Sequence, residues 1–425
     1  MRPGRPSLFP VGEALLRTRI EGMNRVMNSP EKLNSAIEIS GAGPSGLSAA
    51  ITIAKSGGRA IVHEHSSDVG MRFHGDFQGL ENWTTKKDVL EVLHDVGIED
   101  GFEHTPFREM VIYDPRGREH RYCSLEPFFY LVRRGPTRGM LDAGLRDQAL
   151  KCGVEIRFRQ ACSHLPHGGI VAQGPRGSDA IAVGYTFETD MADGAFGAVS
   201  DQLAPKGYSY LLVHKGIGTI ASGIFEDYHN EKKYLDATVA FFRQKTGVKM
   251  VNARHFGGTG NFLVPRTARN GKVLFVGEAA GFQDALWGFG MRYAMLSGHL
   301  AARAILDGRE EEYDRLWRDL FGETLRAGIV NRYTFEKLGN VGYGKLLAVI
   351  DRSHNVRDWL RIHYGMTFWK GLSYPFAHRA VRTNRKAAAC VMEGCDCTWC
   401  RCQHGLPKAT QETTALKEGA AYGSE

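Results

Sequence analysis

The feature that most constrains the fold is a glycine-rich turn at residues 41–46. A strand-like run, 36–40, precedes it, and a helix-like run, 47–57, follows and ends at glycine. Residues 59–64 then return to an apolar, strand-like run. A strand, a glycine-rich turn, a helix and a second strand in this order predict the parallel crossover of a doubly wound sheet. We therefore expect an α/β protein with a Rossmann-like, dinucleotide-binding domain.

Three glycines in the turn have the spacing of a dinucleotide-binding motif. Gly41 permits the tight turn, Gly43 lets backbone N–H groups approach a pyrophosphate, and Gly46 allows close packing of the helix. Glu64 ends the next strand, 23 residues after Gly41, where a carboxylate accepts ribose hydroxyls. The predicted cofactor contacts also include the two residues inside the turn, Pro44 and Ser45. The motif alone does not separate FAD from NAD.

A second segment, residues 272–305, separates the two cofactors. Its sequence, KVLFVGEAAGFQDALWGFGMRYAMLSGHLAARAI, resembles the segment with which flavoproteins of the geranylgeranyl reductase family hold the ribityl chain and the flavin edge. Related aromatic hydroxylases share this segment in modified form. The resemblance implies FAD, with an acidic residue accepting from ribityl hydroxyls and a helix N-terminus facing the ring. The contacts that it implies are Gly277, Glu278, Gly281, Gly288, Gly290 and Met291.

Particular residues of this segment bear on the chemistry. Gly281 stands where the hydroxylases have His, which favours reduction over hydroxylation. Glu278 stands where the family usually has Asp. Trp287 and Phe289 replace smaller or polar residues near the ring face, and we expect them to narrow the pocket or to stack on a substrate.

Arginines from two other segments are expected near the cofactor. Residues 129–135 are similar to a stretch in which the family brings an Arg to FAD, and we assign that position to Arg134, with Arg133 as the alternative. A surface cation on a loop is the competing interpretation of this pair. Arg72 lies in the loop after the Glu64 strand, where the family approaches its cofactor.

The expected substrate pocket is defined less sharply. Residues 204–223 resemble the family's cavity-lining stretch, with Tyr208 and Tyr210 as its aromatic pair, although the same alternation describes any half-buried strand. Trp287 and His74 are further pocket candidates. A packed or solvated imidazole is the first interpretation of His74, and an acid catalyst is the second. No single side chain is required as the catalyst, because the flavin carries the hydride.

The resemblance implies an FAD-dependent oxidoreductase that reduces C=C bonds of an isoprenoid or other lipid-like, apolar substrate by hydride transfer from flavin N5. The alternatives are a flavin monooxygenase acting on a hydrophobic or aromatic substrate, and a membrane-associated flavin electron-transfer protein. A halogenase is disfavoured because the Trp-x-Trp-x-Ile-Pro signature is missing. Since there is no second dinucleotide fingerprint, NADPH docking transiently and reduced ferredoxin both remain open as electron donors.

Changes of pattern along the chain predict its organisation. The FAD-binding domain is expected to be discontinuous, with an inserted antiparallel-sheet substrate domain and a helical C-terminal region. The predicted segments are an N-terminal extension (1–34), the first part of the FAD domain (35–165), the substrate sheet (166–265), the second part of the FAD domain (266–310), a basic and aromatic helical region (311–389) and a cysteine-rich tail (390–425).

The chain is mildly basic, since Lys and Arg exceed Asp and Glu by 54 − 47 = 7. The basic residues are concentrated in one stretch near the C-terminus. Residues 352–386 interleave cations with aromatic side chains, as in a segment lying on an anionic membrane surface, or in a solvated helix packed by its aromatics. No run of about 20 apolar residues or signal-peptide pattern is present. We therefore expect a cytoplasmic protein, peripheral at the membrane in one interpretation, and no binding of nucleic acid.

Five cysteines crowd the tail within 13 positions: Cys390, Cys395, Cys397, Cys400 and Cys402. Closely spaced thiolates can surround a metal ion, but only one pair has the CxxC spacing. Metal binding, redox activity and flexible free thiols all remain open.

Overall fold

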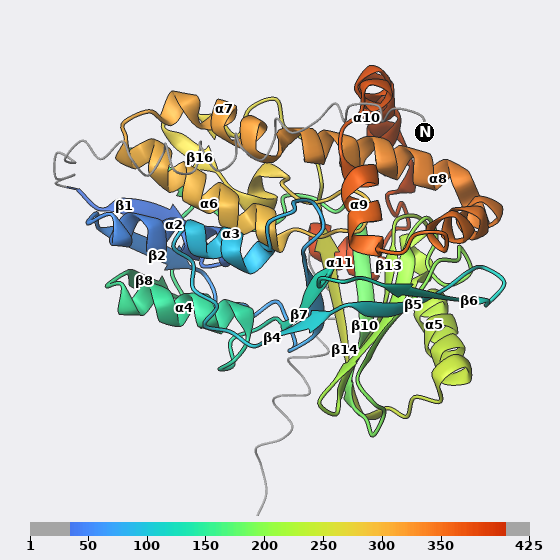
Figure 1. Cartoon of the computed structure of the whole chain (residues 1–425). Coiled ribbons are helices and arrows are strands. Elements are labelled where there is room, and N and C mark those ends of the chain that lie inside the picture. The colour runs from blue at the N-terminus through green and yellow to red at the C-terminus, as the bar shows by residue number, and fades with distance from the viewer. Residues whose placement is uncertain (1–34, 405–425) are drawn as a thin grey trace, which may run out of the picture.

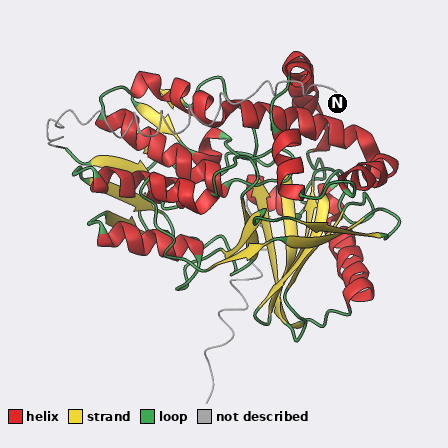
Figure 2. Cartoon of the chain, in the orientation of Figure 1, coloured by secondary structure: helices red, strands yellow, loops and turns green. Residues whose placement is uncertain are grey.

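The computed structural model describes residues 35–404 (Figure 1). The expected extension 1–34 and the end of the tail, 405–425, lie outside the described residues. Figure 2 shows one group of strands among helices on one side, a larger group on the other, and long helices across the top of the view. The fold is α/β with a helical C-terminal region, as the sequence predicts.

A six-stranded sheet carries the glycine-rich turn. Its order is β15-β16-β9-β1-β2-β8, and all neighbours pair in parallel except β15 and β16. Ile37 and Ile39 are both buried, as the strand-like run predicts. The strands are β1 (Ile37–Ser40), β2 (Ala60–Glu64), β8 (Glu155–Phe158), β9 (Gly169–Val171), β15 (Arg269–Asn270) and β16 (Val273–Phe275). Because parallel strands end at one edge, the segments after β1, β2 and β16 meet there.

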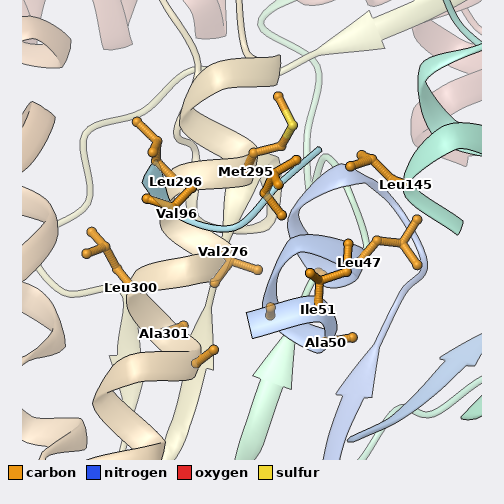
Figure 3. Close-up of a cluster of buried hydrophobic side chains, with 14 of the residues drawn as sticks. Leu47, Ala50, Ile51, Val96, Leu145, Val276, Met295, Leu296, Leu300 and Ala301 are labelled. Atoms are coloured by element: carbon orange, nitrogen blue, oxygen red, sulfur yellow. The ribbon is translucent and has the colours of Figure 1, made fainter. Parts of the chain in front are cut away.

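Three packed helices cover this sheet. α2 (Pro44–Lys55) follows the turn, with α6 (Met291–Leu306) on one side and α4 (Leu141–Lys151) on the other. α2 and α6 approach closely because Gly298 has no side chain; a Cβ there would lie 2.1 Å from the carbonyl oxygen of Ser45. The buried cluster between the helices is drawn in Figure 3 and includes Leu47, Ile51, Leu145, Met295 and Leu300.

A seven-stranded sheet forms the other side of the molecule (Figure 1). Its order is β14-β10-β13-β12-β11-β5-β6, and only β11 and β5 pair in parallel. α5 (Glu231–Thr246) packs against it. The strands are β5 (Glu109–Tyr113), β6 (Glu119–Cys123), β10 (Ala180–Glu188), β11 (Gly194–Ala198), β12 (Tyr208–His214), β13 (Ile217–Ile224) and β14 (Val251–Gly260). β10 to β14 lie within residues 166–265, the segment for which the sequence predicts an antiparallel sheet.

A small antiparallel sheet and the C-terminal helices complete the fold. The sheet has the order β3-β7-β4. α8 is kinked at Gly339, whose φ of 54° and ψ of −174° are not helical. The sheet and its neighbouring helix comprise β3 (Phe77–Glu81), α3 (Val89–Asp95), β4 (His104–Phe107) and β7 (Phe129–Arg133). The later helices are α7 (Tyr313–Trp317), α8 (Glu323–Ile350), α9 (Val356–Tyr364), α10 (Phe368–Ala388) and α11 (Thr398–His404), and the short turns are η1 (Tyr228–Asn230), η2 (Gly277–Ala280), η3 (Glu310–Glu312) and η4 (Arg318–Gly322).

The predicted segment boundaries differ from the sheets at two places. β5 and β6 fall within the predicted first part of the FAD domain, 35–165, but they pair in the seven-stranded sheet. β9 falls within the predicted substrate segment, 166–265, but it lies between β1 and β16 in the parallel sheet. Each sheet is therefore built from segments that alternate along the chain.

Candidate functional site

The glycine-rich turn is shaped by backbone contacts. Gly41 has a φ of +107°, and a Cβ on it would lie 2.4 Å from the carbonyl oxygen of Ala172, just after β9. A Cβ on Gly46 would lie 2.0 Å from the carbonyl oxygen of Gly41. Around Gly43 the nearest such atom is 4.0 Å away. Packing therefore requires glycine at the outer two positions, and the middle position leaves the backbone open to a ligand.

Glu64 lies at the end of β2, beside this turn. Its side chain is buried and accepts hydrogen bonds from the backbone N–H groups of Ala42, at 2.9 Å, and of Ser66, at 2.8 Å. These bonds hold the carboxylate at the carboxyl edge of the sheet, where a ribose would lie in a dinucleotide site.

Ser45 and Gly277 join the two segments that the sequence assigns to the cofactor. Gly277 has a φ of +56°, and a Cβ on it would lie 2.8 Å from the Ser45 hydroxyl oxygen. The Gly277 N–H donates to the Ser297 hydroxyl on α6 at 2.9 Å. The first turn of α2, the end of β16 and α6 are thus held together without an intervening side chain at Gly277.

Glu278, the residue after Gly277, forms an ion pair with Arg72. Their charged groups lie 3.3 Å apart, and Arg72 also donates to the Thr259 carbonyl on β14 at 3.4 Å. The other carboxylate oxygen of Glu278, Oε1, is buried and has no hydrogen-bond partner. A buried acceptor without a partner is costly, so this oxygen fits a donor such as a ribityl hydroxyl.

The loop between η2 and α6, residues 281–290, is irregular, and α6 begins at Met291. Gly281 has a φ of +80°, and a Cβ there would lie 2.4 Å from the Leu263 carbonyl oxygen. The Gln283 amide donates to the Gly288 carbonyl at 2.8 Å. Gly290 precedes the first helical residue, so the loop ends at a helix N-terminus, where negative charge is stabilised.

Asp284 stabilises this loop from inside and was not assigned from the sequence. Its carboxylate accepts from the Trp287 N–H at 2.7 Å and from the Tyr364 hydroxyl at 3.2 Å. Burial raises the pKa of the Asp284 carboxyl to about 6. An acidic residue in the middle of the loop is visible in the sequence, but its hydrogen-bond partner on α9 is 80 residues away.

Arg332 of α8 is a second residue that the sequence reading missed. It is fully buried and donates to the Leu286 carbonyl at 3.1 Å, and its guanidinium pairs with Glu336 at 3.2 Å. It also donates to the Lys206 carbonyl, just before β12. We call residues 281–290, between η2 and α6, the flavin-type loop. The C-terminal helices therefore hold the flavin-type loop against the seven-stranded sheet.

Arg134 is already paired within the protein. Its guanidinium makes two hydrogen bonds of 2.8 Å to the Asp142 carboxylate and lies 3.9 Å from the centre of the Phe73 ring. Arg133, the alternative, donates to the Gly75 carbonyl at 3.3 Å and is less buried. Arg133 is the last residue of β7 and Arg134 follows it, so both lie beside the loop that contains Arg72. A contact of either arginine with a pyrophosphate stays a prediction.

The aromatic candidates meet at the loop. The Tyr208 hydroxyl donates to the Trp287 carbonyl at 2.6 Å, and their ring centres lie 5.2 Å apart. Tyr210 lies 6.0 Å from Tyr208, and Trp287 also packs edge-on against Phe335 of α8 at 5.1 Å. Burial raises the pKa of both tyrosines, so both hydroxyls stay protonated near neutral pH.

His74 and Phe289 lie apart from this aromatic contact. The His74 side chain is exposed, and its ring is 6.5 Å from Phe256 of β14. Phe289 packs edge-on against Trp83 at 4.7 Å. The structure therefore brings Tyr208, Tyr210 and Trp287 together and leaves His74 outside their contacts.

Comparison with known proteins agrees with this architecture, although no protein-family model matches the chain. A digeranylgeranylglycerophospholipid reductase from Haloferax volcanii is 23% identical over 375 residues, covering 75% of this chain and 90% of the relative. A geranylgeranyl bacteriochlorophyll reductase-like protein from Thermoplasma acidophilum superposes with a TM-score of 0.63 at 16% identity, covering 82% of this chain and 98% of that one. A flavin-dependent brominase superposes with a TM-score of 0.56 at 14% identity, covering 83% and 100%.

The fold and the site together define a flavoprotein, an FAD-dependent oxidoreductase. The open backbone at Gly43 and the unpaired oxygen of Glu278 fit the phosphate and ribityl parts of this cofactor. Within this class, the chain is similar to flavoproteins of the geranylgeranyl reductase type. The resemblance inferred from the sequence is confirmed at this level.

Proposed function

We propose that this flavoprotein reduces carbon–carbon double bonds of an isoprenoid or other lipid-like substrate. A relative named as the reductase of such a lipid aligns with most of both chains. The contact that carries the proposal is the hydrogen bond from the Tyr208 hydroxyl to the Trp287 carbonyl, because it joins an aromatic strand of the larger sheet to the loop at the flavin site. An apolar chain lying along this strand would reach that loop.

Cofactor binding in this proposal uses both ends of the site. The backbone of the glycine-rich turn and the N-terminus of α2 would hold the phosphates, Glu64 the ribose, and Glu278 the ribityl hydroxyls. The N-terminus of α6 would stabilise negative charge on the ring. Bound FAD would supply the hydride, so the protein positions the double bond and excludes water. The proposed contacts are Gly41, Gly43, Pro44, Ser45, Gly46, Glu64, Arg72, Arg134, Gly277, Glu278, Gly281, Gly288, Gly290 and Met291.

The aromatic side chains would form the substrate wall. Tyr208, Tyr210 and Trp287 are partly buried. Tyr210 and Trp287 pack in one cluster with Phe335 and Leu212, and Tyr208 joins it through its ring contact with Trp287. The Tyr208 proton is directed at a backbone carbonyl, so we assign this residue to positioning and water exclusion instead of proton transfer. Apolar walls suit an isoprenoid chain because its burial is driven by the hydrophobic effect.

The experiment is anaerobic reoxidation of the dithionite-reduced protein in a stopped-flow instrument. A lipid carrying geranylgeranyl chains should reoxidise the flavin, and the fully saturated lipid, as the matched control, should not. Fast reoxidation by oxygen with a hydroxylated product, and no response to the unsaturated lipid, would replace the proposal with a monooxygenase. Protein that retains no flavin would contradict the class itself.

The electron donor is proposed to be NADPH or a reduced ferredoxin. Replacing dithionite by each donor in the same instrument tests this point. The donor that reduces the flavin at a useful rate is the physiological type, and failure of both would refute this part of the proposal.

We also propose that one face of α10 contacts an anionic membrane surface, where a lipid substrate would reside. Phe368, Trp369, Leu372 and Phe376 are 62–75% exposed. At 100° per residue these four side chains lie within an arc of about 100°. Within residues 35–404, no helix combines the length and the apolarity needed to cross a bilayer.

Cations continue this stripe toward the end of the helix. Arg379, Arg382 and Lys386 lie about one to three turns beyond Phe376 and surround a surface hollow together with His378 and Thr383. Aromatic side chains followed by cations match the interface and the headgroups of an anionic membrane.

Vesicle co-sedimentation tests this surface. The protein should bind vesicles of phosphatidylglycerol more strongly than vesicles of phosphatidylcholine, and the double variant Trp369→Glu, Phe376→Glu should lose that binding. Leu150→Glu is the control, since Leu150 is an exposed apolar residue at the end of α4, far from α10 (Figure 1). Equal losses in the variant and the control would contradict the assignment.

A further inference from the structure

Four of the five tail cysteines gather at one point. Cys390 follows α10, Cys395 and Cys397 lie before α11, and Cys400 is on α11. Their sulfur atoms all lie within 4.8 Å of one another. Cys402, on the same helix, is outside this group and is exposed. The fold therefore selects four ligands from five cysteines that the sequence could not separate.

We propose that these four thiolates bind one Zn²⁺ ion that fixes the tail on the seven-stranded sheet. A tetrahedral ion with zinc–sulfur bonds of about 2.3 Å has sulfur–sulfur edges of about 3.8 Å, which is within the observed spread. In an iron–sulfur cluster the four thiolates are divided between two or among four iron atoms, so some of their sulfurs stand farther apart than on one ion. Four sulfurs that all lie within 4.8 Å of one another favour a single ion. Four sulfur ligands with no open position are typical of a structural zinc site.

The segment between Cys397 and Cys400 is held in place by contacts that do not need the metal. The Glu231 carboxylate, at the start of α5, accepts from the Thr398 N–H at 2.8 Å and from its hydroxyl at 3.0 Å. The Trp399 indole donates to the Ser178 carbonyl at 3.0 Å and stacks on Tyr228 at 6.1 Å, with 7° between the planes. Two ligands flank these residues, so half of the site is already positioned on the sheet.

The surroundings of the sulfurs are apolar. Cys397 and Cys400 are buried in one cluster with Ile181, Val183 and Leu235. Binding converts four S–H groups into four zinc–sulfur bonds and releases four protons to solvent. A shared dication offsets the charge of the resulting thiolates, which would otherwise be costly beside these apolar side chains.

The proposed zinc site and the cofactor residues are connected through the same strand, β14. A Cβ on Gly257 of β14 would lie 2.7 Å from the Thr398 hydroxyl oxygen, so α11 packs directly on this strand. Two residues further along β14, Thr259 accepts from Arg72, which pairs with Glu278. Loss of zinc should therefore loosen the strand that supports Arg72. The zinc site itself does not depend on the proposed substrate.

Metal analysis of the full-length flavoprotein tests the proposal. The protein is expressed with equal zinc and iron in the medium and purified without an immobilised-metal step. We expect about one zinc per chain and no stoichiometric iron. The double variant Cys397→Ser, Cys400→Ser should fall to background zinc, and the matched control Cys402→Ser should keep the wild-type content.

A second measurement covers the case in which the double variant does not fold. An organomercurial titrated into the folded wild-type protein should release zinc, read with a chromogenic chelator, as the tail thiols react. Hydrogen exchange should then increase in residues 251–260. Stoichiometric iron, disulfides among the four cysteines, or equal zinc loss in Cys402→Ser would each overturn the proposal.

Discussion

The contact between α2 and α6 permits a quantitative prediction for Gly298→Ala. The added Cβ would lie 2.1 Å from the Ser45 carbonyl oxygen and 3.1 Å from the Ala49 nitrogen, both backbone atoms. Overpacking of this kind costs about 1–3 kcal/mol, and we expect the upper end because backbone cannot rotate away. The better helix propensity of Ala returns about 1 kcal/mol. The expected net loss is about 2 kcal/mol.

The assay is thermal unfolding followed by circular dichroism, with flavin release followed by fluorescence. The unfolding midpoint of Gly298→Ala should fall by about 2 °C, the shift that about 2 kcal/mol produces in a chain of this length. Flavin should be released earlier, because Ser45 belongs to the turn that would bind the phosphates. Gly371→Ala on α10 is the control, since nothing lies within 4 Å of its added Cβ. That control should be neutral or slightly stabilising. A Gly298→Ala variant with the wild-type midpoint and flavin content would refute the reasoning.

Three further predictions concern charged groups. The folded-state pKa of Asp284 is about 6 against an ordinary value of 3.8, so its stabilising contribution is present below pH 3.8 and is lost as pH rises through 6, by about 3 kcal/mol in all. Asp284→Asn should therefore flatten the pH dependence of urea unfolding between about pH 4 and 7, and an unchanged slope would contradict this origin. Glu278→Ala should weaken FAD binding by about 10- to 100-fold, which is the contribution of a hydrogen bond to a charged group. Glu278→Asp should keep most of the wild-type affinity. Equal affinities of the two variants in a fluorescence titration would argue against the contact. Arg332→Met should cost about 3 kcal/mol in unfolding free energy, the lower end for a broken buried pair, because Glu336 keeps Arg385 as a partner; a wild-type midpoint would be inconsistent with this network.

The parts of the fold that depend on neighbouring residues were predictable from the sequence. The strand, turn, helix and strand from Ile37 to Glu64 lie where periodicity and glycine spacing predict them. Sheet membership was not predictable in the same way, because it depends on pairing between distant segments. β5 pairs with β11, about 85 residues later, and β9 has three residues, too few for a recognisable period.

The residues of the candidate site also fall into two groups, those that neighbouring residues determine and those that distant segments determine. Gly41, Gly46 and Gly281 are required by local backbone geometry, so their spacing is visible in the sequence. Arg332 and Tyr364 reach the flavin-type loop from helices that follow it, and nothing near them in the chain indicates this contact. A charge count likewise could not show that Arg134 is already paired with Asp142.

The alternation of the two sheets along the chain determines when the protein can fold during its synthesis. The parallel row beside β9 is complete only after β16, which ends at Phe275, has been synthesised, and α2 is covered only after α6, which ends at Leu306, has followed. A nascent chain that stops before Leu306 exposes the apolar side of α2, and one that stops before β16 also has an open edge at β9. Truncations before residue 306 should therefore aggregate instead of giving a smaller nucleotide-binding unit.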